Sequence, residues 1–300
     1  MKSVFIGGYG PGIVMIGGGL TRVASPSFLA VHPTQRVLYA VGELERGWLT
    51  AYEVERSPAP LDERPSEGDS PCHVAVDPEG ALLAVANYGD GTATLYRLDE
   101  RGAFAGDPIV LRHEGSGPNA ERQEGPHAHQ AVFHDGLLHV SDLGTDEIRR
   151  YRYDGTPVEP IRLSPGTGPR HFAFSGSRLY VAGELDGSVT LIDGERRTVV
   201  HASRRPGENA PSHLQLEGDL VYVANRGPNT ISVLRAADLS PVGEVPSGGD
   251  WPRHFAIDGD RMYVANQHSD QVTVFALRGG LPEPTGEAYD VDSPACVLIS

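Results

Sequence analysis

Two stretches of the chain decide its fold: Pro169-Arg-His-Phe-Ala-Phe-Ser-Gly-Ser-Arg-Leu-Tyr-Val-Ala-Gly-Glu184 and Pro252-Arg-His-Phe-Ala-Ile-Asp-Gly-Asp-Arg-Met-Tyr-Val-Ala-Asn266. Each contains a short apolar strand, a glycine turn and a second strand that ends in a polar residue. Similar units begin at six prolines, and a seventh proline opens a lone last strand. These prolines are Pro26, Pro71, Pro126, Pro169, Pro211, Pro252 and Pro294, at intervals of 45, 55, 43, 42, 41 and 42 residues. A repeat of about 40–45 residues with several short strands is typical of a β-propeller.

Each unit is predicted to contain four strands. In the fourth unit we expect them at residues 170–175, 178–183, 188–192 and 198–202, where β-branched and aromatic residues alternate with small or polar ones. A unit of this kind can bury its faces only against its neighbours. Residues 1–300 are therefore expected to form one all-β domain, a seven-bladed β-propeller.

The two ends of the chain are expected to complete the seventh blade together. Residues 293–300 resemble a first strand with nothing after it, whereas residues 1–9 and 12–16 resemble second and third strands with no first strand before them. Pairing the last strand with the first ones would remove two open sheet edges.

Bulk properties exclude several classes of partner. The net charge is −15, which repels nucleic acid and anionic membrane surfaces. The first residues are too rich in glycine for a signal peptide, and no run of about 18 apolar residues could span a membrane. With only two cysteines, a cytoplasmic protein with reduced thiols is expected. The oligomeric state is left open.

Counting back from each hairpin turn predicts which residues face each other. The count pairs Arg170 with Glu184, His129 with Asp142 and His73 with Asn87. Because the first strands of a propeller line its central channel, these pairs should gather at one mouth. Contacts to substrate are expected there from Arg122, His73, Asn87, Asp142, His171, Asn225, His254 and Asn266.

Some of these features are repeated and therefore also suit a packing role. Histidine occurs at the same position of four units, at His73, His171, His213 and His254. Asparagine ends three second strands, where it could cap a turn. A feature present in most units serves blade packing more readily than chemistry.

The features that break the repeat are better candidates for catalysis. Only units four and six contain Pro-Arg-His, only unit three contains His-Ala-His, and a glutamate ends the second strand only in units one and four. Histidine transfers protons near neutral pH, and two arginines can bind an anion and stabilise an oxyanion as water attacks an ester. Glutamate could orient the histidine or act as a base. The predicted catalytic set is His127, His129, Arg170, Glu184 and Arg253.

Motifs of other mechanisms are missing from the chain. There is no Gly-x-Ser-x-Gly elbow, phosphate-binding glycine loop or His-x-x-x-His zinc pair. Direct activation of water, without a metal or cofactor, is the simplest expectation. A calcium-like ion held by Glu43, Asp142 and Glu184 together with the asparagines is the alternative. The 55-residue interval marks an insertion at residues 112–125, which runs into the His-Ala-His motif and is expected to serve function.

One stretch carries a family resemblance, Ser116-Gly-Pro-Asn-Ala-Glu-Arg-Gln-Glu-Gly-Pro-His-Ala-His129 followed by Val140-Ser-Asp-Leu-Gly-Thr-Asp146. It resembles the seven-bladed propeller lactonases, which include the propeller type of 6-phosphogluconolactonase and a carboxymuconate-cyclising enzyme. Shorter matches occur at residues 38–43, 86–89, 168–171 and 263–266. In the muconate-cyclising branch, catalysis is attributed to a histidine, two arginines and a glutamate, which would fall here on His127 or His129, Arg170, Arg253 and Glu184.

The resemblance implies a metal-independent lactonase that hydrolyses a sugar lactone, with 6-phosphogluconolactone as the expected substrate. The expected partner is a small anionic lactone or carboxylate. Two alternatives remain: a cycloisomerase that forms a lactone from an unsaturated diacid, and a non-catalytic propeller that binds proteins or small ligands at its mouth.

Overall fold

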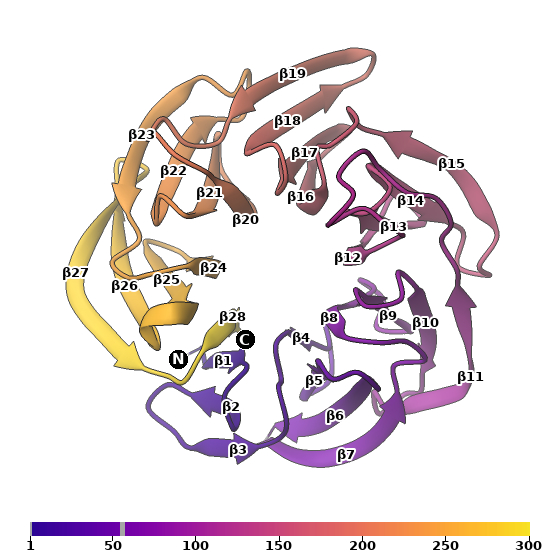
Figure 1. Cartoon of the computed structure of the whole chain (residues 1–300). Coiled ribbons are helices and arrows are strands. Elements are labelled where there is room, and N and C mark those ends of the chain that lie inside the picture. The colour runs from indigo at the N-terminus through magenta and orange to yellow at the C-terminus, as the bar shows by residue number, and fades with distance from the viewer. Residues whose placement is uncertain (1, 55–57) are drawn as a thin grey trace.

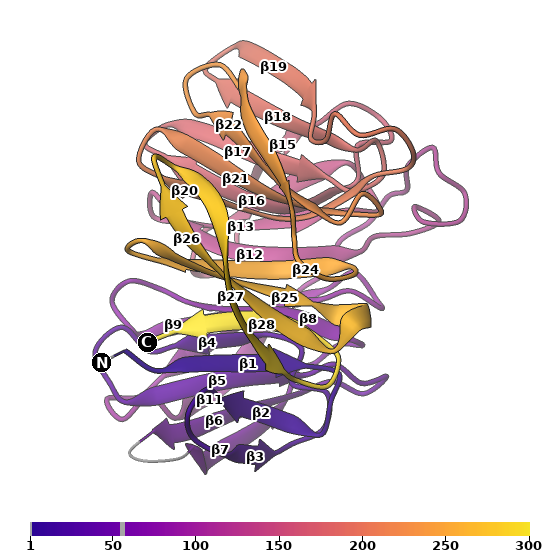
Figure 2. The same cartoon turned by 90° about the vertical axis from the view of Figure 1, so that its left-hand side faces the viewer.

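The computed structural model describes residues 2–54 and 58–300. It contains seven four-stranded antiparallel sheets placed side by side in a ring, and the strands run across the thickness of the ring (Figures 1 and 2). The prediction of an all-β, seven-bladed propeller is confirmed. Among the described residues, no helix is long and apolar enough to cross a membrane.

Within each blade the strands follow one another outward from the centre, except that the last strand of the chain begins the blade that contains the first three (Figure 1). The innermost strands are β4 (Leu29–Val31), β8 (Pro71–Val76), β12 (Ala128–His134), β16 (Pro169–Ser175), β20 (Ala210–Glu217), β24 (Pro252–Asp258) and β28 (Pro294–Ile299). The second strands are β1 (Val4–Gly8), β5 (Val37–Gly42), β9 (Leu82–Asn87), β13 (Leu137–Asp142), β17 (Arg178–Gly183), β21 (Leu220–Arg226) and β25 (Arg261–Asn266).

The third strand of each blade is largely buried, whereas the outermost strand is more exposed. The third strands are β2 (Gly12–Met15), β6 (Trp48–Val54), β10 (Ala93–Leu98), β14 (Glu147–Tyr151), β18 (Ser188–Asp193), β22 (Thr230–Arg235) and β26 (Gln271–Arg278). The outermost strands are β3 (Leu20–Arg22), β7 (Pro58–Pro65), β11 (Phe104–Leu111), β15 (Pro157–Arg162), β19 (Arg196–His201), β23 (Pro241–Pro246) and β27 (Leu281–Asp290). In the described part of the chain, one 3₁₀ turn, η1 (Gln267–Ser269), is present and follows β25.

Strand β28 closes the ring by pairing with β1. Phe5 lies opposite Leu298 and Ile6 lies opposite Val297 in an antiparallel ladder. Phe5, Ile6 and Val297 are buried against the neighbouring blades. The predicted joining of the two chain ends is confirmed, although residue 1 of the predicted first segment lies outside the described residues.

The apolar core lies between neighbouring sheets. Side chains of β5 and β6 pack against those of β8 and β9, and equivalent clusters join the following blades. Three buried tyrosines of the second strands, Tyr39, Tyr180 and Tyr222, donate a hydrogen bond of 2.7 Å to a carbonyl of the next blade. The repeated tyrosine of the sequence pattern is therefore a contact between blades.

The register of the inner hairpins differs from the predicted one. Ala128, not His129, pairs with Asp142, and Pro71, not His73, pairs with Asn87. Glu184 lies just beyond β17, and its N–H donates to the carbonyl of Gly168, so it does not pair with Arg170 in the ladder. The predicted pairs were wrong because each of these three inner strands contains a β-bulge, an extra residue that a count from the turn does not detect.

We predict that the ring cannot remain closed without β28. Deleting residues 293–300 leaves β1 with an unpaired edge and exposes the apolar faces on both sides. The expected result is aggregation or loss of a cooperative thermal transition, measured by circular dichroism and size-exclusion chromatography. Val297→Asp should have a similar but smaller effect because it buries an unpaired charge, whereas deleting only Ser300 should be tolerated. An unchanged melting temperature in the full deletion would contradict this account of closure.

Candidate active site

Six of the inner strands carry their β-bulge close to their first residue. In β24, Pro252 pairs with Asn266 and His254 pairs with Ala265, so Arg253 has no partner in the ladder. The equivalent extra residues elsewhere are Cys72, His129, Ser212, Ala295 and, in β16, Arg170 together with His171. A bulge redirects its side chain out of the regular alternation of the strand.

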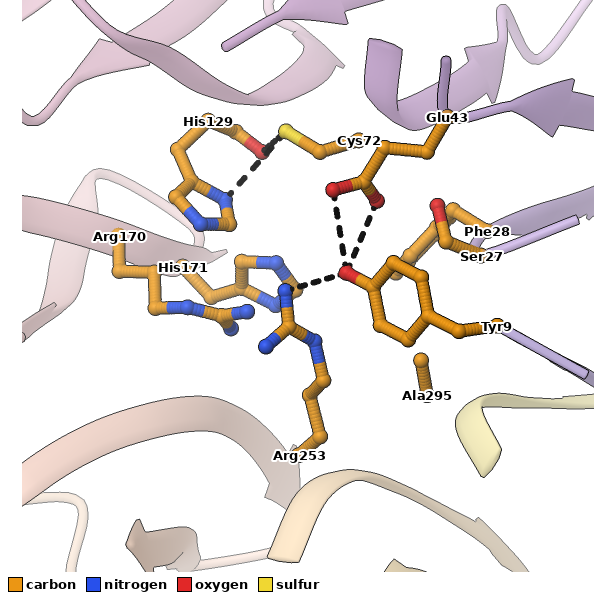
Figure 3. Close-up of a pocket in the computed structure, with 10 residues that line it drawn as sticks. All are labelled: Tyr9, Ser27, Phe28, Glu43, Cys72, His129, Arg170, His171, Arg253 and Ala295. Atoms are coloured by element: carbon orange, nitrogen blue, oxygen red, sulfur yellow. Dashed lines mark hydrogen bonds between the residues drawn. The ribbon is translucent and has the colours of Figure 1, made fainter. Parts of the chain in front are cut away.

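These bulge residues converge on a small pocket (Figure 3). The cavity volume is about 10 Å³, which is about the minimum that a cavity needs to hold one water molecule. The pocket is lined by Tyr9, Ser27, Phe28, Glu43, Cys72, His129, Arg170, His171, Arg253 and Ala295. All the bulge residues except Ser212 are in this set, and they come from five different blades.

Glu184 is the centre of a buried ion cluster beside this pocket. Arg170 Nε and Arg226 Nη2 lie 3.0 and 2.6 Å from its Oε2, and Arg122 Nη2 lies 2.7 Å from its Oε1. Burial favours the neutral acid, but the charges of Arg226 and Arg170 outweigh it and hold the pKa of Glu184 well below its usual range. Glu184 is therefore a fixed anion that orients arginines, and it is poorly suited to act as a base.

Arg170 remains charged in this setting. Burial, followed by the nearby charges of Arg226 and Arg253, lowers its pKa to about 9, so the guanidinium is protonated at neutral pH. Arg170 also donates a hydrogen bond to the carbonyl of Ser212 in the next blade. Contacts to Glu184 and Ser212 hold the group in place at the pocket.

Arg253 is held by a different pair of residues. Its Nη2 donates to Tyr9 Oη at 2.6 Å, and the Tyr9 hydroxyl in turn donates to both carboxylate oxygens of Glu43 at 3.0 and 3.1 Å (Figure 3). The guanidinium also lies 5.1 Å from the centre of the Tyr9 ring, a cation–π distance. Burial is the main reason that the pKa of Tyr9 is raised, so the hydroxyl stays protonated.

His129 is the imidazole of the predicted catalytic set that lines the pocket. Burial, and then the charge of Arg170, lowers its pKa well below the usual value, so the imidazole is neutral and has a free lone pair, although the lowered pKa also makes it a weaker base than an exposed histidine. Its Nδ1 lies 3.7 Å from Cys72 Sγ. Burial raises the pKa of the Cys72 thiol, which keeps it in the SH form and makes it a weak nucleophile.

Residues 14–299 match the family described as Lactonase, 7-bladed beta-propeller. The chain belongs to this lactonase family. It is 31% identical over 257 residues to the 6-phosphogluconolactonase of Bacillus subtilis, which covers 77% of this chain and 73% of that protein. It is 29% identical over 238 residues to the 6-phosphogluconolactonase of Formosa agariphila, with 71% and 67% covered.

A solved structure of the same architecture is similar over almost its whole length. The periplasmic gluconolactonase PpgL of Pseudomonas aeruginosa superposes with a TM-score of 0.88 at 25% identity, and 99% of this chain and 98% of that chain are covered. The names of these relatives include both a phosphorylated and an unphosphorylated lactone.

The repeated histidines of this lactonase form a second layer next to the bulge residues. The histidine layer consists of His73, His171, His213 and His254, each directly after a bulge residue or part of the bulge. His171 Nδ1 and His213 Nδ1 are 2.8 Å apart, and the ring centres of His213 and His254 are 3.9 Å apart. Only His171 of this layer lines the pocket. The layer packs mainly against itself and Phe28.

The predicted asparagines lie inside the blades and bond to their own blade. Asn87 donates to Thr92 and Thr94, Asn225 to Thr230 and Ser232, and Asn266 to Thr273. All three are fully buried and none lines the pocket. Their positions suit bracing of the loops that follow the second strands.

Asp142 and His127 support the inserted loop. Asp142 accepts hydrogen bonds from His113 Nδ1 at 2.8 Å and from the N–H of His127 at 2.9 Å. The His127 ring stacks on Tyr88, with ring centres 4.5 Å apart, and its Nδ1 bonds to the Tyr88 carbonyl at 2.9 Å. His127 therefore lies outside the set that lines the pocket, unlike His129.

The carboxylates proposed to share a cation are occupied by protein donors. Glu184 is paired with arginines, Glu43 with Tyr9 and Asp142 with His113. Within residues 2–54 and 58–300, no group of three or more His, Cys, Asp or Glu side chains is arranged to hold a metal ion.

Sequence reasoning missed Arg226, Tyr9 and the role of Cys72. Arg226 is buried and touches Glu184, but it follows an asparagine that suggested a turn cap. Tyr9 comes from the blade that the chain ends share, where no Pro-x-His motif precedes it. One signal was available: in three of the four Pro-x-His motifs, the residue after proline is the bulge residue that lines the pocket, as at Cys72, Arg170 and Arg253.

We predict that the protein loses stability in mild acid. Burial lowers the pKa of His129 and of the whole histidine layer, so the folded protein leaves these groups neutral. In the unfolded chain they titrate near pH 6.5. Below that pH only the unfolded state takes up the protons, and the free energy of unfolding falls by up to about 1.4 kcal/mol per pH unit for each group.

Urea unfolding between pH 8 and pH 5 measures this slope. His254→Gln should reduce the slope of stability against pH, because it removes one buried imidazole. Glutamine should fit there, since blade three already has Gln130 at the equivalent position. Replacement of the exposed His201 should not change the slope. Equal stability at pH 8 and pH 5 would show that the layer is protonated in the folded protein.

Proposed function

We propose that the protein hydrolyses 6-phosphogluconolactone to 6-phosphogluconate. One observation carries the proposal: in a member of the propeller lactonase family, a neutral imidazole, His129, shares a pocket with two charged guanidiniums, Arg170 and Arg253. A neutral imidazole can accept a proton from water, and guanidiniums stabilise the negative oxygen that forms when water attacks a carbonyl. These are the requirements of ester hydrolysis without a covalent intermediate.

Lactone hydrolysis can proceed with these residues and one water molecule. His129 Nδ1 is turned towards Cys72, so Nε2 takes a proton from water as the water oxygen bonds to the lactone carbonyl carbon. Arg170 and Arg253 bind the resulting oxyanion. When the ring C–O bond breaks, the imidazolium returns the proton to the departing ring oxygen. The product is an open-chain acid that loses its proton to solvent.

The charge of the site favours an anionic substrate. Four guanidiniums (Arg122, Arg170, Arg226, Arg253) accompany two carboxylates (Glu43, Glu184), which leaves an excess of two positive charges. The protein as a whole carries −15. A local cationic site in an acidic protein suits a dianion such as a phosphate monoester. Two free buried cysteines, Cys72 and Cys296, accord with action in the cytoplasm.

We predict that His129→Ala and Arg170→Ala lower turnover by at least about 100-fold. His127→Ala is the matched control: the change is the same, but His127 contacts the Tyr88 backbone instead of lining the pocket. We expect it to retain most of the turnover.

The assay uses freshly generated 6-phosphogluconolactone coupled to 6-phosphogluconate dehydrogenase, with the spontaneous rate subtracted and folding checked by circular dichroism. Full activity in His129→Ala would place the base elsewhere. No acceleration by the natural protein would reject the substrate and direct the search to other lactones and to unsaturated diacids.

We predict that Tyr9→Phe lowers kcat about tenfold without unfolding the protein. The change keeps the aromatic ring beside Arg253 but removes the hydroxyl that connects this guanidinium to Glu43. Tyr39→Phe is the control, because the Tyr39 hydroxyl bonds only between blades; it should lower the melting temperature and leave kcat unchanged. If Tyr9→Phe behaves as Tyr39→Phe does, the hydroxyl of Tyr9 has a structural role only.

A further inference from the structure

The inserted loop between β11 and β12 is anchored to the blades at both ends. Near its beginning, His113 Nδ1 bonds to Asp142 at 2.8 Å. Near its end, the buried Gln123 donates to the carbonyl of Leu143 at 2.9 Å and accepts from the N–H of Asn119 at 3.1 Å. The loop therefore has a fixed shape, and it presents Arg122 to the ion cluster of Glu184.

Arg122 differs from the other arginines of the cluster in its exposure. Its side chain is 43% exposed, compared with 3% for Arg170 and 6% for Arg226. Its hydrogen bonds to Glu184 Oε1 and to Tyr88 Oη both come from Nη2. Nε and Nη1 are left for a ligand that arrives from solvent.

The size of the pocket places most of the substrate outside it. A volume of about 10 Å³ accommodates a water molecule at His129, but not a six-membered lactone. Arg122 lies close to this pocket, because Tyr88, whose hydroxyl accepts from Arg122 Nη2, has its ring centre 5.5 Å from that of the pocket residue His129. Arg122 is the solvent-accessible guanidinium of this cluster.

We infer that Arg122 is a specificity-determining residue that binds the phosphate of a phosphorylated lactone. The inference rests on the proposed function. In the empty site Glu184 and Tyr88 hold the guanidinium through one nitrogen, so its remaining N–H groups are oriented for a phosphate before the substrate arrives. A lactone without phosphate would make no use of Arg122. Arg122 would therefore favour a phosphorylated lactone over an unphosphorylated one, the two kinds of lactone named among the relatives of this chain.

The test compares two lactones that differ only in the phosphate, 6-phosphogluconolactone and glucono-1,5-lactone, with Arg122→Gln and Arg122→Lys. For the phosphorylated lactone, Arg122→Gln should raise KM at least about tenfold with kcat within about twofold, as expected for loss of a charge-assisted contact. Its kcat/KM for glucono-1,5-lactone should fall by less than about threefold, because Arg170 and Arg226 still hold Glu184 in place. Arg122→Lys should be intermediate, because it keeps the charge but loses the planar fork.

Direct binding of the two products gives an independent measurement. Calorimetry should show that Arg122→Gln weakens 6-phosphogluconate at least about tenfold and leaves gluconate unchanged. Arg112→Gln is the matched control, because Arg112 is an exposed arginine at the start of the same loop and lies away from Glu184; it should change neither product.

The outcomes separate the two proposals. Equal losses on both lactones would overturn the inference, since Arg122 would then only position Glu184. Unchanged binding and kinetics in Arg122→Gln would overturn it as well. If the natural protein hydrolyses neither lactone but binds 6-phosphogluconate through Arg122, the proposed function fails while the phosphate site stands.

Discussion

The backbone pairing of β28 with β1 is the interaction on which the rest of the molecule depends. Each sheet is apolar on both faces and can bury them only against the sheets beside it. In an open row of blades, the two end sheets would each expose an apolar face. Closure by one antiparallel ladder removes these faces and also fixes the diameter of the centre, where residues from different blades must meet at hydrogen-bond distance.

Inside the closed ring, neighbouring residues at the start of an inner strand have different roles. In β8, β16 and β24 a bulge residue lines the pocket, and the histidine next to it packs into the histidine layer. Neutral imidazoles suit this layer because they can bond to one another without burying charge, as His171 and His213 do. Charge is concentrated instead in the arginines and carboxylates at the mouth.

The sequence predicted the fold well because a propeller repeats, and a spacing of 41 to 45 residues between prolines in most units is characteristic of four-stranded blades. It also led to Arg170, Arg253, Glu184 and His129, since a residue that breaks the repeat has no packing reason to differ. The predicted register was wrong at the bulges, because a count back from the turn assumes regular pairing along the whole strand. Arg226 and Tyr9 were missed because their roles arise from contacts between distant blades, Arg226 with Glu184 and Tyr9 with Glu43.

The absence of a ladder partner at the bulge has an evolutionary consequence. A substitution at Arg253 or Ala295 changes what the pocket presents without altering strand pairing. Six of the blades thus have a position that can change without disturbing the ladder, and together these positions form a combinatorial set. New substrates can be explored on one unchanged scaffold by a few single-residue replacements, which would help to explain how relatives of the same backbone came to bear the names of different lactones.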